Sequence, residues 1–287
     1  MLGRDRIQYK TADQVRLMRR AGLLVADALD AVRAALRPGV TTADLDTVAE
    51  DVIRGAGGTP SFVGYHGYPA TLCVSVNDEI VHGIPGSRVI EAGDVVSVDG
   101  GAIVGGWHGD AAFTAVVPGA DGARPAGGEH AAADGADPAD VALTEMTEQA
   151  MWRGIAAMAD GERLNAVGAA VEDHVAGRYG LVEEYGGHGI GTEMHQEPHV
   201  LNYRIRDKGP RMRPGLCLAI EPMLTRGDPT TRLMPDGWTV MTVDGSRAAH
   251  WEHTVALGDG GLWVLTARDG GVAALAALGV TAAPLAD

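Results

Sequence analysis

The sequence predicts an α+β domain built from two similar halves, because helix-like and strand-like segments alternate twice along its 287 residues. Apolar residues recur at helical spacing near the N-terminus, and short apolar runs typical of strands follow. The same order, helices and then strands, returns after residue 140. The two halves share no visible pattern of residue identities, so the duplication is inferred from the order of elements alone.

Two helices are expected at the start of the chain. Thr11 followed by Gln14 predicts a capping box, and apolar residues then recur at helical spacing until the Pro-Gly pair at 38–39. A second amphipathic helix follows Thr41 or Thr42. We expect the first helical segment to pack on the core of the protein.

The remaining helices and strands are predicted from changes in the spacing of apolar residues along the chain. Residues 118–140 are dominated by Gly, Ala, Asp and Pro with almost nothing to bury, so we expect a flexible acidic surface loop there. Strands are predicted over 72–76, 95–98, 111–117, 216–220, 238–243 and 262–265, and helices over 141–158 and 164–175. The predicted divisions are an N-terminal helical segment over 1–40, a main domain over 41–270 and a C-terminal tail over 271–287.

Charge and composition exclude several classes of protein. The formal net charge is −15, which argues against binding to nucleic acid or to an anionic membrane, since both need a basic surface. Cys73 and Cys217 each lie in an apolar run and are interpreted as reduced core thiols. The segment 17–36 is interrupted by charges, so it is an amphipathic helix and no signal peptide, and no run reaches the length of a membrane span. We therefore expect a cytosolic protein.

Asp99 and Asp110 are the first candidate site residues. Asp99 closes the apolar run 95–98, and Asp110 begins the next strand. A tight turn centred on Val104 and Gly105 would place the two carboxylates directly opposite each other, with Cβ atoms about 5 Å apart. Such a pair raises its own pKa values unless a cation lies between the two groups. Alternatively, either aspartate faces solvent at a strand end.

Three more residues favour the cation. His188 is flanked by glycines on both sides, which is more typical of a ligand or catalyst than of a structural histidine. Glu221 ends an apolar strand, where a carboxylate must be paired or bound to metal, and Glu252 directly precedes another strand. Each glutamate alone could be an ordinary surface residue. It is harder to explain all five candidate residues, the two aspartates, the histidine and the two glutamates, as ordinary residues at once.

This donor set predicts a hydrolytic metal centre. Four carboxylates and one imidazole suit Mn²⁺, Fe²⁺, Co²⁺ or Zn²⁺. Two ions bridged by carboxylates would turn a water into a nucleophile near neutral pH, which implies hydrolysis of a carbonyl or phosphoryl bond. The sequence has no Walker-type phosphate loop, which favours the carbonyl. His82 and His195 would fit a peptide bond in such a site, whereas His66 and His199 are better interpreted as turn or surface residues.

At these residues the sequence resembles type I methionine aminopeptidases. The resemblance covers roughly residues 10–267, and although each segment alone would be weak evidence, together they run in the family's order. The segments are GYHGYPATLCVSVNDEIVHGIPG (64–86), GDVVSVDGGAIVGGWHGDAAF (93–113), YGGHGIGTEMHQEPHVLNY (185–203), PGLCLAIEPM (214–223), DGWTV (236–240) and WEHT (251–254).

The resemblance implies the pita-bread fold, with two pseudo-symmetric halves around a site for two divalent metal ions. It implies that Asp110 and Glu252 bridge the ions and that Asp99 binds one of them. It assigns the other ion to His188 and Glu221. Glu221 is further implied to be the general base toward the bridging water.

The implied reaction is removal of the initiator methionine from nascent polypeptides, with preference for a small second residue. A metal-bridging hydroxide attacks the first peptide carbonyl in the family. His82 is implied to contact the scissile amide and help the leaving amine, and His195 to stabilise the oxyanion. Transient contact with the ribosome and a monomeric state are expected with this activity.

The family's methionine pocket falls on apolar and aromatic positions, which suit a thioether. Without the resemblance, these positions would be interpreted as plain core residues. Phe62 and Met194 depart from the family, since other members carry Cys and Phe there. The pocket positions are Phe62, Tyr65, Tyr68, Cys73, Met194 and Trp238.

Three competing interpretations were weighed. A proline-specific peptidase of the same fold would share the five ligand types, but the segments GYHGYP and VNDEIVHGIP favour methionine. A non-catalytic relative is disfavoured because all five ligand positions remain acidic or His. A nucleic-acid-binding module is opposed by the net charge.

Overall fold

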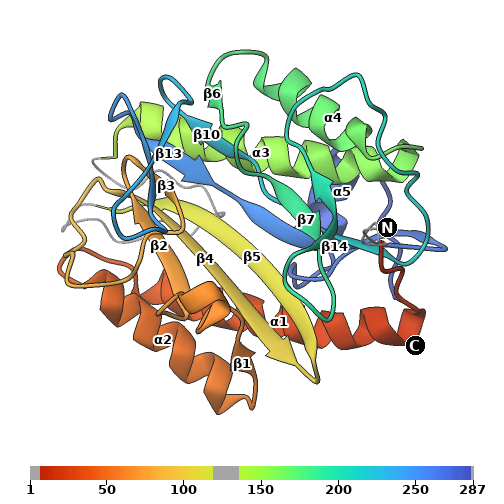
Figure 1. The fold of residues 1–287 in the computed structure, drawn as a ribbon, viewed down its shortest axis with the longest axis horizontal. Coiled ribbons are helices and arrows are strands. Elements are labelled where there is room, and N and C mark those ends of the chain that lie inside the picture. The colour runs from red at the N-terminus through yellow and green to blue at the C-terminus, as the bar shows by residue number, and fades with distance from the viewer. Residues whose placement is uncertain (1–6, 119–135, 286–287) are drawn as a thin grey trace, which may run out of the picture.

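A nine-stranded sheet forms the centre of the structure, and helices pack against it (Figure 1). The structure is a computed structural model that describes residues 7–118 and 136–285. The helices are α1 (Ala12–Ala35), α2 (Thr42–Gly55), the short 3₁₀ helix η1 (Tyr65–Gly67), α3 (Pro138–Asp160), α4 (Asn165–Val175) and α5 (Val272–Ala277). The strands are β1 (Thr59–Pro60), β2 (Leu72–Val76), β3 (Glu79–Val81), β4 (Val95–Val104), β5 (Trp107–Val116), β6 (Gly180–Leu181), β7 (Gly187–Gly189), β8 (Gln196–Val200), β9 (Leu216–Ile220), β10 (Met223–Thr225), β11 (Thr231–Leu233), β12 (Val240–Thr242), β13 (Ala248–His250), β14 (Glu252–Gly258) and β15 (Gly261–Val264).

The large sheet runs in the order β1-β4-β5-β14-β9-β7-β8, with β2 added beside β4 and β15 beside β14. Two smaller sheets, β13-β10-β6 and β11-β12-β3, flank it. The two parts of the large sheet meet where β5 pairs with β14, and this ladder joins only Ala112 to Glu252 and Ala111 to His253. The join between the two halves of the chain is therefore short.

Helices α1 and α2 cover the first part of the sheet, and α3 and α4 cover the second (Figure 1). Phe113 and Ala111 of β5 belong to the main apolar core, together with Val25 and Leu29 of α1. Because side chains alternate along a strand, Asp110 on the same strand points to the opposite face. The sheet thus has one face covered by helices and one face free to carry polar side chains.

The helix starts agree with the capping patterns in the sequence. The Thr11 hydroxyl accepts from the Gln14 backbone, and the Gln14 side chain accepts from the backbone of Thr11, which completes the predicted capping box. Thr41 forms the same reciprocal pair with Asp44 at the start of α2. Both caps satisfy backbone N–H groups that a helix start otherwise leaves unpaired.

Several predicted boundaries move in the structure. Helix α3 starts at Pro138, inside the segment expected to be loop, because Asp137 caps it and proline suits the first helical position. Residues 119–135 of that predicted loop lie outside the described residues. The C-terminal tail expected over 271–287 contains α5, whose Leu275 is fully buried in the core.

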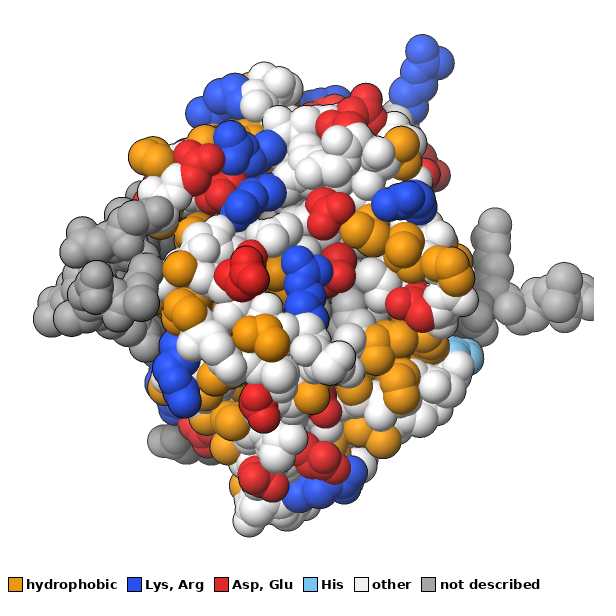
Figure 2. Space-filling model, turned by 90° about the vertical axis from the view of Figure 1, so that its left-hand side faces the viewer, with side chains coloured by type: hydrophobic (Ala, Val, Ile, Leu, Met, Phe, Trp, Pro, Cys, Tyr) orange, Lys and Arg blue, Asp and Glu red, His pale blue; other side chains and the backbone are white. Residues whose placement is uncertain are grey.

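Surface and thiol chemistry follow the composition. Cys73 and Cys217 are both buried and unpaired, as predicted for core thiols. On the face drawn in Figure 2, Lys and Arg side chains are interspersed with Asp and Glu. Among the described residues, no helix has the length and apolar character needed to cross a membrane.

Candidate functional site

The sheet register brings the candidate ligands onto one face. Asp99 and Glu252 both lie opposite Ala112, so they occupy one row across β4, β5 and β14. Asp110 is two residues before Ala112 and therefore projects from the same face. These side chains come from segments far apart in the sequence but lie on neighbouring strands.

The predicted register of the β4–β5 hairpin was wrong by two residues. Asp110 lies opposite Gly101, so Asp99 and Asp110 are diagonal neighbours and do not face each other directly. The turn is made by Gly105 and Gly106, whose φ angles of 59° and 83° suit a tight hairpin that only glycine adopts easily. A shift of two residues preserves the face, so both carboxylates still point into the site.

The glycines around His188 permit close packing of strands. A Cβ atom at Gly187 would lie 2.2 Å from the Ala219 carbonyl oxygen, and one at Gly189 would lie 2.2 Å from the Glu197 carbonyl oxygen. Strand β7 therefore fits tightly between its neighbours and holds His188 toward the site.

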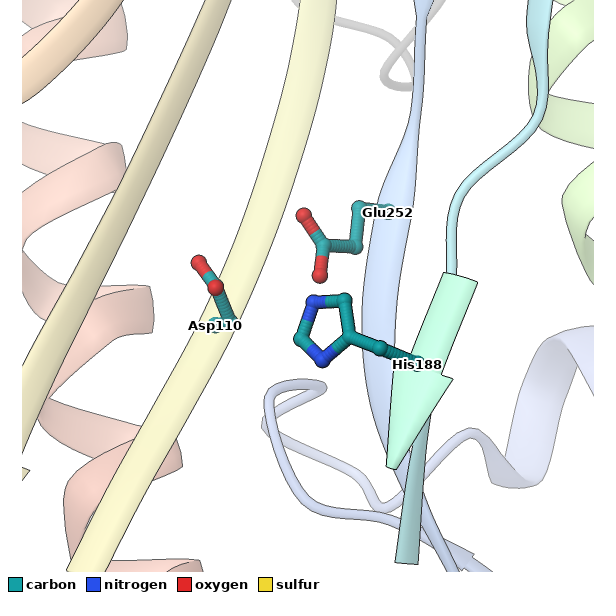
Figure 3. Close-up of side chains that lie close together, drawn as sticks. All are labelled: Asp110, His188 and Glu252. Carbon is teal, nitrogen blue, oxygen red and sulfur yellow. The ribbon is translucent and has the colours of Figure 1, made fainter. Parts of the chain in front are cut away.

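Figure 3 shows Asp110 on β5 close to the Glu252 carboxylate of β14 and the His188 ring of β7, both of which extend toward β5. One donor atom from each of these three residues lies within 4.8 Å of the other two. A second such group consists of Glu221, His250 and Glu252. The two groups share Glu252, which is only 2% exposed.

The Glu221 carboxylate lies between two histidines. Its Oε1 is 3.5 Å from Nε2 of His188, and its Oε2 is 3.7 Å from Nε2 of His250. The Asn202 side chain donates to the backbone carbonyl of Glu221 at 3.1 Å, which fixes the end of β9. Glu221 is thus held at the junction of the two donor groups.

Burial makes negative charge unfavourable at this site. Burial raises the pKa of Asp110 to about 7. A backbone hydrogen bond at Ala111 and a hydrogen bond with Asp99 act in the opposite direction and lower this pKa, but burial has the larger effect. Burial, and then the charge of Asp110, raise the pKa values of Asp99, Glu221 and Glu252 well above the usual range. Four carboxylates in so small a volume repel one another unless positive charge is added.

The nearby histidines are neutral at pH 7. Burial, and to a smaller extent the neighbouring His195, lower the pKa of His188 to about 3. Burial and His195 likewise lower the pKa of His82 to about 4, and burial lowers the pKa of His195 itself. Each imidazole therefore keeps a free lone pair on one nitrogen and an N–H on the other.

A cavity of about 130 Å³ joins the donor cluster to an apolar wall. Tyr68 is the centre of that wall: its ring meets Trp238 edge-on at 5.0 Å and Phe62 at 6.3 Å. The cavity brings together every residue that the sequence analysis placed in the site. Its lining consists of Phe62, Tyr65, Tyr68, Cys73, His82, Asp99, Asp110, His188, Met194, His195, Glu221, Trp238 and Glu252.

His66 and His199 are both exposed, in agreement with their interpretation as turn or surface residues. His250 is a site residue that the sequence analysis missed. It is 2% exposed, and burial lowers its pKa to about 3. Its position two residues before Glu252 could have indicated it, since residues two apart share a face in extended chain.

Buried carboxylate oxygens without a hydrogen-bond partner indicate whether the site suits a metal. Oδ1 of Asp99, Oδ1 of Asp110 and Oε1 of Glu252 are buried without a hydrogen-bond partner among the described residues. Buried polar atoms are normally paired, and buried carboxylates without partners are rare unless they bind cations. The donor set of hard oxygens and neutral imidazole nitrogen fits a divalent transition metal.

Comparison with known proteins identifies the class to which this site belongs. The model of metallopeptidase family M24 matches residues 16–259, and the chain belongs to this family. Within that family, the chain belongs with the methionine aminopeptidases. It is 48% identical to methionine aminopeptidase 1 of Mycobacterium tuberculosis over 272 residues, which cover 92% of this chain and 96% of the relative.

Solved structures confirm the predicted pita-bread fold. The methionine aminopeptidase of Thermotoga maritima superposes with a TM-score of 0.83 at 37% identity, covering 92% of this chain and all of that one. The prolidase of Pyrococcus furiosus superposes with a TM-score of 0.69 at 18% identity, covering 91% of this chain and 65% of that chain. At that identity, the likeness to prolidase shows the shared fold only.

Proposed function

We propose that the protein removes the N-terminal methionine from polypeptides by metal-dependent hydrolysis. The observation that carries this proposal is the cavity in which an apolar wall meets a cluster of carboxylates and histidines. At about 130 Å³ the cavity is below the usual range for drug-sized ligands and suits a single side chain. The relatives named methionine aminopeptidase support methionine as that side chain.

The proposed ligands would hold two divalent ions, drawn from Co, Mn, Fe and Zn. Asp110 and Glu252 would serve both ions, Asp99 would help to hold one of them, and His188 and Glu221 the other. When bound, the ions would lower the pKa of a shared water until it is a nucleophile at neutral pH. The unsatisfied carboxylate oxygens and the mutual approach of the donor atoms support this assignment.

Glu221 is proposed to move the proton of the attacking water. Burial and the charge of Asp110 raise the pKa of its carboxyl, which makes it a stronger base than a surface glutamate. The carboxylate accepts the water proton and returns it to the nitrogen of the leaving amine. His82 lines the same cavity, and we propose that it contacts that nitrogen.

His195 is proposed to donate to the substrate carbonyl oxygen. Its Nδ1 lies 2.7 Å from the Tyr65 hydroxyl. If Tyr65 donates to Nδ1, the proton of the neutral ring resides on Nε2, which is then free to donate. An N–H aimed at the developing oxyanion supplies a large part of the rate enhancement in acyl transfer.

The wider setting stays a prediction from sequence and resemblance. We propose nascent chains that begin with Met as the natural substrates, with a small second residue preferred. Transient ribosome contact, a monomeric state and a cytosolic location are proposed with them. The net charge of −15 supports the absence of a nucleic-acid partner.

A metal add-back assay tests the proposed function. Protein stripped with chelator receives Mn²⁺ or Co²⁺ together with Met-Ala-Ser and an Xaa-Pro tripeptide, and the products are followed by mass spectrometry. We expect metal-dependent release of free methionine and no cleavage before proline. Cleavage only before proline would move the assignment to a prolidase-like peptidase, and tight metal binding without cleavage would favour a non-catalytic relative.

Metal binding is expected to release protons and to strengthen as pH rises. Asp110, whose pKa is about 7, must lose its proton before it can bind a cation, and the carboxyls of Asp99, Glu221 and Glu252 also have raised pKa values. His188 has a pKa of about 3 and is already neutral in this range. The affinity for Mn²⁺ should therefore rise about tenfold per pH unit for each proton released, and the contribution of Asp110 should level off above about pH 7.

Titration calorimetry in buffers of different ionisation enthalpy counts the released protons directly. An affinity that stays constant from pH 5 to pH 8 would contradict the assignment of these carboxyls as ligands.

A further inference from the structure

His250 lies beside Glu221 with a ring nitrogen that no described residue satisfies. Its Nε2 is buried and has no hydrogen-bond partner. The main chain of His250 is fixed from both sides by Thr114, whose hydroxyl accepts from the His250 N–H at 2.9 Å and donates to its carbonyl at 2.7 Å. The ring therefore cannot leave the site by a shift of its own backbone.

The position of the His250 ring is described by its distance from the Glu221 carboxylate. Nε2 of His250 is 3.7 Å from Oε2, while Nε2 of His188 is 3.5 Å from Oε1 of the same carboxylate. A neutral imidazole carries one N–H donor and one acceptor nitrogen. Because a carboxylate oxygen accepts, this surrounding favours the tautomer of His250 that carries its proton on Nε2.

We propose that His250 is a positioning residue for Glu221. It donates Nε2–H to Oε2 and thereby keeps Oε1 turned toward His188 and the centre of the cavity. The separation of 3.7 Å is about half an ångström beyond the usual range of an N–H···O hydrogen bond, so the proposed bond requires the carboxylate to move toward the ring. This inference rests on the proposed function, because the orientation of Glu221 matters only if the site binds metal.

The loss of metal affinity expected when such a residue is replaced has a typical magnitude. Partners that hold a metal ligand through a hydrogen bond typically change metal affinity 10- to 100-fold when they are removed. The competing role is direct ligation, since donor atoms of Glu221, His250 and Glu252 lie within 4.8 Å of one another. A ligand would use the lone pair of Nε2, so the two roles need opposite tautomers and respond differently to substitution.

The experiment compares the full-length protein with His250→Leu and His250→Gln. Leucine has similar bulk and no donor, and glutamine offers an amide N–H that can reach Oε2. Mn²⁺ affinity is measured by titration calorimetry, the visible spectrum of the Co²⁺-loaded protein reports the ligand set, and thermal melting checks folding. His250→Met replaces the leucine variant if that variant does not fold.

We expect His250→Leu to bind Mn²⁺ roughly 10- to 100-fold more weakly and His250→Gln to stay within about threefold of the unchanged protein. The Co²⁺ spectrum of His250→Gln should match that of the unchanged protein. His174→Leu is the matched control, because His174 lies on α4 and is likewise a histidine whose Nε2 is buried without a partner. That control should leave the Mn²⁺ affinity unchanged.

Three results would overturn the inference. Equal Mn²⁺ affinity of His250→Leu and the unchanged protein would remove His250 from the site and leave the proposed function standing. Failure of glutamine to restore affinity, with a Co²⁺ spectrum that shows loss of a nitrogen donor, would establish direct ligation instead. An unchanged protein that binds no Mn²⁺ would overturn the proposed function together with this inference.

Discussion

Replacing Asp110 by asparagine should abolish metal binding and activity while making the chelator-treated protein more stable. Asp110 lies on β5 with a donor atom within 4.8 Å of donor atoms of His188 and Glu252, and it is one of the two proposed bridging ligands. Loss of a residue that merely holds a ligand costs 10- to 100-fold in affinity, so loss of a bridging ligand should exceed about 100-fold. Peptidase turnover should fall by at least about 10³-fold, because the reaction depends on the metal.

The gain in stability follows from the sign of the pKa shift. The pKa of Asp110 is raised from 3.8 to about 7, so the folded state holds its proton more tightly than the unfolded state. Asp110 therefore lowers the free energy of unfolding increasingly as the pH rises from about 4 to about 7. Asparagine removes this penalty, which amounts to roughly 2–4 kcal/mol at pH 8.

Urea unfolding of the two proteins with chelator, at pH 4.5 and pH 8, measures the effect. The control is Asp51→Asn, which makes the same change in charge at an exposed position on α2 and should alter neither stability nor metal binding. An Asp110→Asn protein that keeps full activity would refute the site assignment.

His195→Ala should lower turnover by about 10²–10³-fold and leave metal binding intact. The ring lines the cavity, and its Nδ1 lies 2.7 Å from the Tyr65 hydroxyl, an arrangement that supports the proposed role of Nε2 as the donor toward substrate. Removing one donor to an oxyanion typically has an effect of this size. Steady-state kinetics on Met-Ala-Ser and calorimetry with Mn²⁺ separate the two properties.

His199→Ala provides the comparison for this variant. His199 is an exposed histidine four residues further along the chain, and its removal should change turnover by less than about twofold. If His195→Ala loses metal instead of turnover, His195 is a ligand and the proposed contact with the carbonyl oxygen is wrong.

Local sequence patterns predicted helices α1 to α4 and several of the strands. The capping pairs at Thr11 and Thr41 act within four residues, and strands β2 and β9 are continuous apolar runs whose ends are set by turn residues. Such information lies inside short windows of sequence. The alternation of helices and strands then predicted the α+β class, which the likeness to solved structures confirms.

The site could be predicted in part because strand parity survives errors in register. The choice between Val104-Gly105 and Gly105-Gly106 as the turn moved Asp110 by two residues, and a shift of two leaves every side chain on its face. A shift of one residue would have placed Asp99 and Asp110 on opposite faces of the sheet.

Other parts of the site depend on contacts between distant segments. His250 lies beside Glu221 because β13 pairs with β10, and no local sequence pattern predicts this pairing. The apolar wall joins Phe62, Tyr68 and Trp238, which were identified only through resemblance to a family. Spacing within one segment carries no information about such contacts.

The short ladder between β5 and β14 has a consequence for how the molecule opens. Two residue pairs of the ladder join the parts of the sheet there, together with hydrogen bonds made by the Thr114 and Thr254 hydroxyls, and the donor residues lie on both sides of that join. A cation held, as proposed, by Asp110 on one side and by His188 on the other would add a cross-link between those two sides. Because only the folded state supplies this link, loading with metal should slow amide exchange on both sides together and suppress local opening near the substrate.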